Sequence, residues 1–435
     1  MKIQSTLPPT AAPIPFPALV AGLCGLLGGG GTASRVSREI GQWLGASHVC
    51  LLSSGKAALA LILETLSQGS PRRKVIVPAY TCFSVPSAIR KARLEVVPCD
   101  VNPITLDFKR DSLQRLLDDQ TLCVLTTHLF GLPADVDAVI SLCRPLGIFV
   151  VEDAAQAMGA RSNGRLVGTI GDLGLFSLGR GKNLSCGGGG VVVTRDDRLG
   201  TAMQDTCAAL PKESRLAVAR TWAESAATTL LTRPQLYWFP AGLPFLGLGE
   251  TKFYRDFPMQ RMEDARAATL AGWRDRLETD NAGRRERAEA FIQELKAEVT
   301  DVQPVVNPDA VYLRLPILVR NLAVKQAVLR ESVRQGLGLS QAYPGTIAQI
   351  PELDGHVARE GEEGAKELVA RLVTLPTHRY VTARHRRAIC RVIQQAAADD
   401  ASSRRTTVPE DSAVVHERHP DQIGKVNVSM KRKHA

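Results

Sequence analysis

The stretch Val150-Val151-Glu152-Asp153-Ala154-Ala155-Gln156-Ala157 decides the fold class of this sequence. An apolar run that begins at residue 148 ends in two acids and is followed at once by small residues. A short apolar run of this kind is typical of a strand that is covered on both faces of its sheet. A buried carboxylate is costly unless it meets a cation or a strong donor, so Asp153 indicates a ligand contact. A plain helix cap is the simpler alternative.

Short β-rich runs alternate with helical patterns on both sides of this strand, from about residue 47 onward. The expected strands cover 49–52, 74–78, 94–98, 122–126 and 148–152, and the expected helices cover 57–66, 85–91 and 136–143. This alternation predicts an α/β fold with a mostly parallel sheet. Ligands bind such sheets beyond the carboxyl ends of the strands, so the residues that follow each strand are the candidates for a site.

The pattern changes after Thr194. Residues 200–230 have a helical pattern, an apolar proline-rich loop is expected over 230–248, and a long charged helix over 262–296. The run 311–319 and two later helical patterns indicate a smaller α+β domain. We therefore predict an N-terminal arm and large domain over 1–255 with an insertion at about 205–255, a small domain over 256–400, and a disordered basic tail over 401–435.

Composition narrows the class of protein. None of the nine cysteines forms a CxxC pair, which favours the reducing cytoplasm over a disulfide framework or a metal site. The formal net charge of +10 predicts anionic partners. Aromatic residues make up only 5% of the chain and no helix-turn-helix pattern stands out. These features favour an acidic small molecule over nucleic acid.

Two apolar segments bear on membrane contact. Residues 16–31 follow four prolines and end in four glycines, and residues 230–248 contain an arginine and three prolines. Neither segment has the length and regularity of a transmembrane helix, and the first is a poor signal peptide. We expect surface or oligomer contacts there, with peripheral membrane contact as the alternative.

The segment Ser53-Ser54-Gly55-Lys56 follows an expected strand and opens an expected helix. Free backbone N–H groups and the helix dipole at such a place suit a phosphate group. Lys56 adds a positive charge. Because Ser-Gly before a helix is also an ordinary cap, this segment alone leaves both interpretations open.

A single lysine, Lys182, lies among glycines and apolar residues 29 positions after Asp153. A lysine in a confined apolar site loses its proton and becomes a nucleophile toward an aldehyde. Ser177, five residues earlier, has a hydroxyl that suits a phosphate. A solvated surface lysine is the alternative. The four glycines at 187–190 are interpreted as a turn into a strand at 191–194, because they fit neither common phosphate-binding pattern.

Together these segments resemble the DegT/StrS-type sugar aminotransferases, a branch of the fold-type I enzymes that use pyridoxal 5′-phosphate (PLP). The strongest match is Glu152-Asp153-Ala154-Ala155-Gln156-Ala157 followed by residues 168–183, with the same offset from Ser177 to Lys182. Supporting matches are His128-Leu129-Phe130-Gly131, Tyr343-Pro344 and Leu375-Pro376-Thr377-His378. The resemblance covers about residues 35–395, most strongly before 195, and it implies the fold-type I PLP-dependent transferase fold.

The resemblance also implies a role for each matching residue. Lys182 is the expected catalytic residue, which holds the cofactor as a Schiff base and shuttles the proton. Asp153 is expected to pair with the pyridine nitrogen and Gln156 to contact the ring hydroxyl. The residues expected to hold the phosphate are Ser54, Gly55, Lys56 and Ser177. The residues expected beside the substrate are His128, Tyr343 and His378.

Several residues depart from the family pattern. Lys56 stands where threonine is usual, and Cys82 stands where an aromatic side chain usually stacks on the cofactor. Two alternatives follow: the stacking contact is lost, or Tyr80 or Phe83 supplies the ring. Met259 occupies the position of an asparagine that reaches the phosphate of the partner subunit, and the 205–255 insertion is longer than usual.

The function implied by the resemblance is PLP-dependent transfer of an amino group, from glutamate, to a nucleotide-linked keto sugar. Polysaccharide or secondary-metabolite sugar biosynthesis in a cytoplasmic homodimer is the expected setting. A sugar dehydratase of the same family is disfavoured, because those members carry histidine in place of Lys182. A regulatory or scaffold protein that has lost turnover is the alternative from another class, and it is favoured by Met259 and the apolar insertion.

Overall fold

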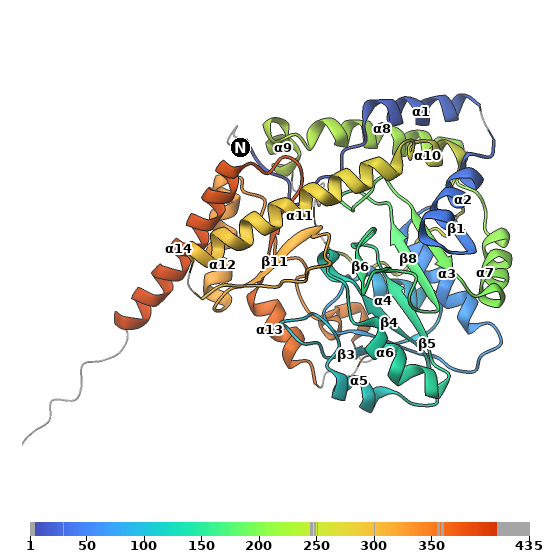
Figure 1. The fold of residues 1–435 in the computed structure, drawn as a ribbon, viewed down its shortest axis with the longest axis horizontal. Helices are drawn as coiled ribbons and strands as arrows, with labels where there is room; N and C mark the ends of the chain where they lie inside the picture. Colours follow the sequence, from blue (N-terminus) through green and yellow to red (C-terminus); the bar gives the residue numbers. More distant parts are fainter. Residues whose placement is uncertain are drawn as a thin grey trace, which may run out of the picture.

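A seven-stranded sheet lies at the centre of the computed structural model, which describes residues 5–406 apart from 29, 244–246, 248, 250, 300, 355, 356 and 358–360 (Figure 1). The strand order is β1-β9-β8-β5-β4-β2-β3. The strands are β1 (His48–Leu52), β2 (Lys74–Pro78), β3 (Glu95–Cys99), β4 (Thr121–Thr127), β5 (Phe149–Asp153), β8 (Leu173–Ser177) and β9 (Gly190–Thr194). Within this sheet β9 alone runs antiparallel to its neighbours. The prediction of an α/β fold with a mostly parallel sheet is confirmed.

Helices cover both faces of this sheet, because alternate strand residues are apolar on each side. Val75 and Val77 face a core that includes α3, α4 and α7, while Ile76 faces a second core with α5 and α6. The helices of this part are α1 (Phe16–Leu27), α2 (Thr32–Leu44), α3 (Gly55–Ser67), α4 (Ser84–Lys91), α5 (Arg110–Leu116), α6 (Val136–Cys143) and α7 (Asp197–Ala209). Short elements complete it: η1 (Leu129–Gly131), η2 (Arg144–Leu146) and the hairpin β6 (Arg161–Ser162) and β7 (Arg165–Leu166).

A three-stranded antiparallel sheet and several helices form the C-terminal half. The strands are β10 (Gln303–Pro304), β11 (Arg314–Leu318) and β12 (Leu372–Pro376). The helices are α10 (Asp264–Ala268), α11 (Trp273–Glu298), α12 (Leu322–Gln335), α13 (Glu363–Arg371) and α14 (Ala383–Thr406), with the short turns η4 (Ile347–Gln349) and η5 (Pro351–Leu353). One apolar core joins this sheet to Tyr80 and Phe130 of the N-terminal half. The ends of the central strands therefore lie close to the second sheet.

The structure corrects three expectations about secondary structure. The charged helix expected over 262–296 is two helices, α10 and α11, because Gly272 has a left-handed backbone with φ of 63°. The loop expected over 230–248 contains α9 (Pro234–Ala241), which follows α8 (Arg215–Leu231). Proline at the first helical position is compatible with a helix start, so Pro234 does not interrupt the chain there. The strand β8 was not expected at all.

The two termini differ from their sequence-based descriptions. Residues 16–27 form α1, which packs beside α8 at one edge of the molecule (Figure 1). Helix α14 continues to Thr406, so the first residues of the expected disordered tail are helical, and 407–435 lie outside the described residues. In the part of the chain that the structure describes, no helix is both long and apolar enough to cross a membrane.

A short N-terminal arm, residues 5–14, crosses from the C-terminal half toward α8. Its backbone is held by distant parts of the chain: Thr6 N–H donates to Pro234 O, and Leu7 N–H donates to Gly336 O, both at 2.8 Å. Farther along, Ile14 N–H donates to the Thr229 hydroxyl at 3.1 Å. The arm is therefore an integral part of the fold.

Candidate active site

Asp153 and Lys182 come together at the carboxyl edge of the central sheet. Asp153 is the last residue of β5, and Lys182 lies in the loop after β8, the neighbouring parallel strand. Burial raises the pKa of Asp153 and lowers the pKa of Lys182, and the charge of each residue opposes the shift of the other. The two residues that the sequence singled out are thus electrostatic neighbours. A lowered pKa favours the neutral amine of Lys182, which is the nucleophilic form.

A small polar cradle lies beside this pair. Ser54 caps α3, with its hydroxyl accepting from Ala57 N–H at 3.2 Å. Gly55 approaches Ser177 so closely that a Cβ at Gly55 would lie 3.0 Å from the Ser177 hydroxyl oxygen. The start of a 13-residue helix and a serine hydroxyl therefore face the same space, an arrangement that suits a phosphate. As expected from the sequence, the structure brings Ser54, Gly55 and Ser177 together.

Several buried polar atoms at this edge have no partner within the protein. The hydroxyls of Ser53, Thr81 and Thr127 and the Asn183 carbonyl oxygen make no hydrogen bond. Each residue lies at or just beyond the end of a strand, or beside Lys182. A buried polar atom without a partner costs roughly 1–3 kcal/mol, so this edge is suited to a polar ligand that supplies the missing bonds. The residues present therefore fit a phosphorylated, hydrogen-bonding cofactor.

Gln156 and Tyr343 form a hydrogen-bonded pair next to Asp153. Gln156 Nε2 donates to the Tyr343 hydroxyl at 2.7 Å, and Phe130 N–H donates to Gln156 Oε1 at 3.2 Å. Burial holds the pKa of Tyr343 well above its usual value, so its hydroxyl stays protonated. The sequence assigned Gln156 to the cofactor ring and Tyr343 to the substrate. The contact between them means that the two sides of the site adjoin.

Sequence reasoning missed the role of Glu152. This fully buried side chain accepts from the N–H groups of Gly168, Ile170 and Gly171 at 2.5–2.7 Å. Burial alone would raise the pKa of Glu152, but the hydrogen bond and charge of His128 and these N–H groups lower it overall. Glu152 therefore stays ionised and anchors the loop that leads into β8. The sequence signal for this role is an acidic residue, Glu152, within an apolar strand.

His128 does not have the geometry expected of a substrate contact. Its side chain is fully buried, with Nε2 at 3.0 Å from Glu152 Oε2 and Nδ1 accepting from Ala134 N–H at 3.0 Å. Both ring nitrogens are used, so His128 supports Glu152 instead. The physical reason is that the buried carboxylate of Glu152, on the neighbouring strand β5, needs a hydrogen-bond donor, and His128 supplies it.

His378 also differs from its expected place beside the substrate. Its Nε2 donates to Pro8 O at 2.8 Å, and its Nδ1 accepts from Tyr380 N–H at 3.4 Å. Burial lowers its pKa to about 3, so the ring is neutral. His378 holds the N-terminal arm against the C-terminal half and has no ring nitrogen left for a substrate.

The residues that depart from the family pattern are placed as follows. Cys82 is half-buried and interacts electrostatically with Lys182, as its position predicts. Phe83 packs into the core below α3, so the prediction that it binds the cofactor is not supported. Tyr80 is fully buried, and its hydroxyl donates to Gln341 O at 3.3 Å, so it does not replace the stacking ring either.

Lys56, the second residue of α3, interacts electrostatically with Cys82 and also contacts the 253–259 segment, which contains Met259. The Lys56 ammonium is 3.3 Å from the ring centroid of Tyr254 and 5.2 Å from that of Phe257. In this cation–π contact the Lys56 ammonium, which the resemblance implied would bind the phosphate, lies against an aromatic ring. Met259 packs against the same core as Phe257. In this arrangement both substituted residues contribute to the packing of the 253–259 segment.

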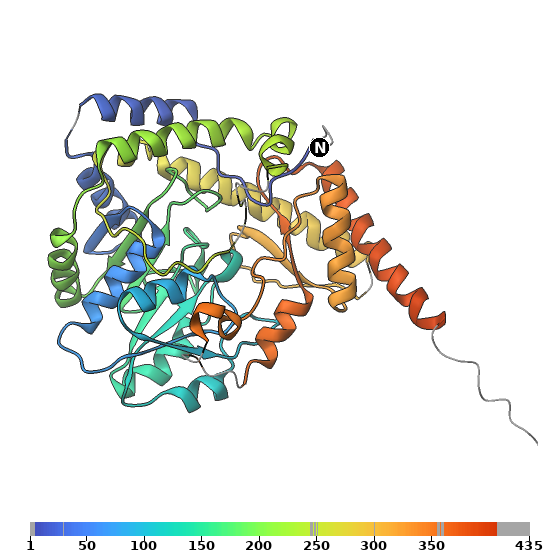
Figure 2. The ribbon, with the colours of Figure 1, turned by 180° about the vertical axis from the view of Figure 1, so that it is seen from behind.

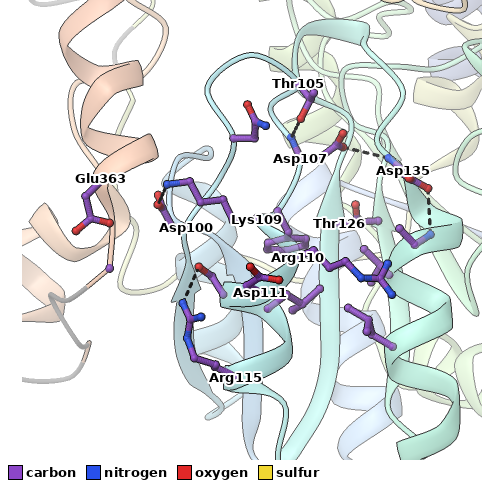
Figure 3. A pocket seen from close by; sticks show the side chains of 18 residues that line it. Asp100, Thr105, Asp107, Lys109, Arg110, Asp111, Arg115, Thr126, Asp135 and Glu363 are labelled. Carbon is purple, nitrogen blue, oxygen red and sulfur yellow. Dashed lines mark hydrogen bonds and ion pairs between the residues drawn. The ribbon is translucent and has the colours of Figure 1, made fainter.

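A cavity of about 720 Å³ lies away from Lys182, between β3, α5, α6 and the start of α13 (Figure 3). Three of the acids that line it, Asp100, Asp107 and Asp135, have structural partners. Asp100 pairs with Lys109 at 2.5 Å and accepts from Gly364 and Ala365 N–H at the start of α13. Asp107 accepts from Asp135 N–H at 3.1 Å, and Asp135 caps α6. Within the described residues, no cluster of three or more His, Cys, Asp or Glu side chains could hold a metal.

Comparison with known proteins gives curated relatives that match part of the chain. A UDP-N-acetyl-3-dehydro-alpha-D-glucosamine 3-aminotransferase from Acidithiobacillus ferrooxidans is 36% identical over 175 residues, 40% of this chain and 47% of that protein. The GDP-perosamine synthase of Vibrio cholerae is 30% identical over 197 residues, 43% of this chain and 50% of that protein. The matched regions thus span about half the length of these two relatives.

Solved structures share the fold over nearly their whole length. Helicobacter pylori PseC, an aminotransferase involved in pseudaminic acid biosynthesis, has a TM-score of 0.73 at 16% identity and covers 91% of this chain and 100% of its own. The PLP form of Spr1654 from Streptococcus pneumoniae, a sugar aminotransferase by its description, has a TM-score of 0.71 at 17% identity, with coverage of 91% and 99%. These structures establish the fold.

The family model provides the broadest match, from residue 25 to residue 394. Aminotransferases of this family depend on PLP, the cofactor whose phosphate, ring and aldehyde the residues around Lys182 fit. The match includes the central sheet, the lysine loop and most of the C-terminal half. The chain belongs to the DegT/DnrJ/EryC1/StrS aminotransferase family.

Proposed function

We propose that this chain is a PLP-dependent aminotransferase that moves an amino group from glutamate to a nucleotide-linked keto sugar. The observation that carries the proposal is the buried pair of Asp153 and Lys182 beside the cradle of Gly55 and Ser177. The names of the relatives from Acidithiobacillus and Vibrio support a sugar substrate. When bound, PLP supplies an electron sink for the substrate carbon that loses or gains a proton.

Each side chain of the site has a proposed task. Lys182 holds the cofactor covalently and, when free, moves the proton between cofactor and substrate carbon. Asp153 keeps the pyridine nitrogen protonated, because a buried carboxylate favours a cation next to it. The phosphate is held by Ser54, Gly55 and Ser177. Gln156, fixed by Tyr343, lies beside the ring hydroxyl.

The proposed setting is a cytoplasmic homodimer that works in polysaccharide or secondary-metabolite sugar biosynthesis. Exposed apolar residues at Phe16, Val20, Leu23 and Leu27 support self-association, because their spacing places them on one face of α1. Nine free cysteines support a reducing compartment. We also propose the division into a large domain over 1–255 and a small domain over 256–400, supported by the two separate sheets.

The covalent link gives the sharpest test of this proposal. The purified protein should absorb as a PLP protein, and borohydride reduction followed by peptide mass analysis should locate the cofactor on Lys182. Glutamate should bleach that absorbance. The Lys182→Ala variant should lose both covalent trapping and bleaching, while Lys212→Ala, which changes a more exposed lysine, should retain them. Trapping that persists in Lys182→Ala would exclude the assignment.

A catalytically inactive protein of the same fold is the second candidate. It is favoured by the half-buried Cys82, which leaves no aromatic ring at the usual stacking position. Absorbance that no amino acid bleaches, combined with normal trapping on Lys182, would support this candidate over the aminotransferase. The presence of Lys182 argues against the dehydratase.

A further inference from the structure

A pocket of about 640 Å³ is lined by Arg180 and Gly181, the two residues that precede Lys182. Its walls are the N-terminal arm, the lysine loop, α8 and α9, whose segments lie near one another in Figure 2. The arm and the lysine loop are in direct contact, because a Cβ at Gly181 would lie 2.2 Å from the Thr10 hydroxyl oxygen. Most lining side chains are apolar or carry a hydroxyl, such as Ile14, Thr228 and Leu231.

Arg314, the first residue of β11, enters this pocket from the second sheet. Its guanidinium donates to the Ser340 hydroxyl at 3.3 Å, and in the described part of the chain no carboxylate lies within ion-pair distance of it. Burial lowers its pKa, which the neighbouring hydroxyls of Tyr343, Tyr80 and Tyr237 counteract. Arg314 is therefore a partly buried cation with unused donors.

Two other buried arginines have more acceptors than Arg314. Arg266 pairs with Glu213 at 2.7 Å, and Arg284, which has no acid beside it, donates to the carbonyl oxygens of Leu313 and Ala11. A buried charge destabilises a fold unless hydrogen bonds or an opposite charge compensate it. Among the described residues, Arg314 has the Ser340 hydroxyl as its one hydrogen-bond acceptor and lines a pocket, so its remaining donors are suited to an anion that enters from solution.

We propose that Arg314 binds a carboxylate of the amino donor, an inference that rests on the proposed aminotransferase function. A guanidinium presents two parallel N–H donors that match the two oxygens of a carboxylate. Arg180, the other arginine of the pocket, is exposed and pairs with Glu224 at 3.2 Å. One unpaired guanidinium matches the single charge of a carboxylate better than the charges of a diphosphate.

The position of Arg314 relative to Lys182 supports the same assignment. Arg314 and Gly181, the residue before Lys182, line the same pocket, and the charge of Arg314 acts on the Lys182 amine. An anion held at Arg314 therefore lies on the side of the lysine loop from which an amino acid would approach that amine. Arg314 takes no proton in this role. It orients the donor so that the amino group faces the reacting edge, while the apolar wall of α8 and the arm receives the carbon chain.

The test compares Arg314→Met with Arg220→Met, which removes an exposed arginine of α8 that pairs with Glu224 and does not line the pocket. Glutarate, which has two carboxylates and no amino group, measures binding without turnover by calorimetry on the PLP-loaded protein. We expect Arg314→Met to weaken glutarate binding and to slow the glutamate half-reaction by about 10- to 100-fold, because one charge-assisted contact is lost. Arg220→Met should stay within about twofold of the parent. Arg314→Lys should have intermediate glutarate affinity and rate, since it keeps the positive charge but lacks the two parallel N–H donors of a guanidinium.

Two amides of glutamate identify which carboxylate is bound. Isoglutamine lacks the α-carboxylate, and glutamine lacks the γ-carboxylate. If Arg314 binds the α-carboxylate, isoglutamine should react at the same rate with the parent and with Arg314→Met, and glutamine should react more slowly with the variant. If Arg314 binds the γ-carboxylate, the two amides should exchange these results. A purely structural role for Arg314 would slow all donors alike.

The outcomes separate this inference from the proposed function. A parent protein that binds PLP but responds to no amino acid contradicts the aminotransferase, not the binding of glutarate by Arg314. Equal glutarate binding by the parent and Arg314→Met overturns the inference. It is also overturned if Arg314→Met slows only the reaction with the keto-sugar acceptor, because Arg314 then binds a phosphate of that acceptor. If Arg314→Met does not load PLP, the same measurements on Arg314→Lys decide.

Discussion

Single buried side chains determine how this protein responds to pH. His378 has a pKa of about 3 in the folded chain because it is buried, against about 6.5 when exposed. The unfolded chain therefore binds a proton between these values that the folded chain does not. The stabilising contribution of the neutral ring is complete above pH 6.5 and declines as the pH falls toward 3.

We predict that, because of His378, the free energy of unfolding falls by about 2 kcal/mol between pH 7 and pH 5. The loss is about 1.4 kcal/mol for each pH unit below 6.5. His378→Gln keeps a donor for Pro8 O and does not titrate. Denaturant unfolding measures the free energy of unfolding at both pH values. From pH 7 to pH 5, this free energy should fall by about 2 kcal/mol less in His378→Gln than in the parent. An identical loss in the two proteins would mean that His378 is not a buried neutral ring.

Residues of the candidate site differ in how far the sequence could reveal them. Lys182 and Asp153 are predictable through the resemblance of residues 152–183 to the family pattern, whereas the apolar surroundings of Lys182 alone leave a surface lysine as the alternative. The burial of His128 and His378 is not predictable, since it depends on Glu152 and Pro8, to which the sequence gives no link. Arg314 was missed for the same reason: its pocket is completed by the N-terminal arm, some 300 positions away in sequence.

At the scale of elements, one glycine sets the direction of a long helix. Gly272 separates α10 from α11 with φ of 63°, and a Cβ placed there meets no atom within 4 Å. The backbone conformation alone therefore opposes a larger residue, without any steric clash.

We predict that Gly272→Ala lowers the free energy of unfolding by about 1–2 kcal/mol, the usual cost of a left-handed backbone for an L-residue. Gly272→Asn should cost less, because asparagine tolerates this conformation. Denaturant unfolding of the two variants measures the difference. If alanine is tolerated as well as asparagine, the bend between α10 and α11 does not depend on this residue.

Elements of the central sheet were predicted closely where apolar runs are bounded by turn residues. The expected strand 74–78 and helix 136–143 coincide with β2 and α6. Strand β8 was missed because its five residues are embedded in a glycine-rich stretch, where local propensity is weak. The prolines of α9 favour a loop over a helix in the sequence. Pro234, however, is the first residue of the helix, a position at which proline is compatible with helical structure.

At the scale of the whole molecule, one face of α1 exposes four apolar side chains to solvent. Phe16 and Leu27 are 77% and 83% exposed, and Val20 and Leu23 lie between them on the same face. Leu216 of the neighbouring α8 is 81% exposed. Such a surface on a chain with a net charge of +10 is suited to contact with another protein surface.

We predict that Leu23→Glu combined with Leu27→Glu converts a dimer into a monomer of 47.0 kDa, as measured by light scattering after gel filtration. Carboxylates buried in an apolar interface are strongly unfavourable. Val333→Glu is the matched control, because Val333 is 80% exposed on α12, away from this face. A double variant that keeps the mass of the parent would place the dimer contact elsewhere, and liposome flotation would then test peripheral membrane binding.

The anchoring of the N-terminal arm has a consequence for the order of events during protein synthesis. Pro8, Leu7 and Ala11 bond to His378, Gly336 and Arg284, all of which leave the ribosome long after the arm itself. Contacts so distant in sequence form late, because most of the chain must be folded first. The arm therefore gains its partners in stages, first Thr229 and Pro234, and later Arg284, Gly336 and His378. The pocket beside the lysine loop acquires its last wall only after His378 has been synthesised.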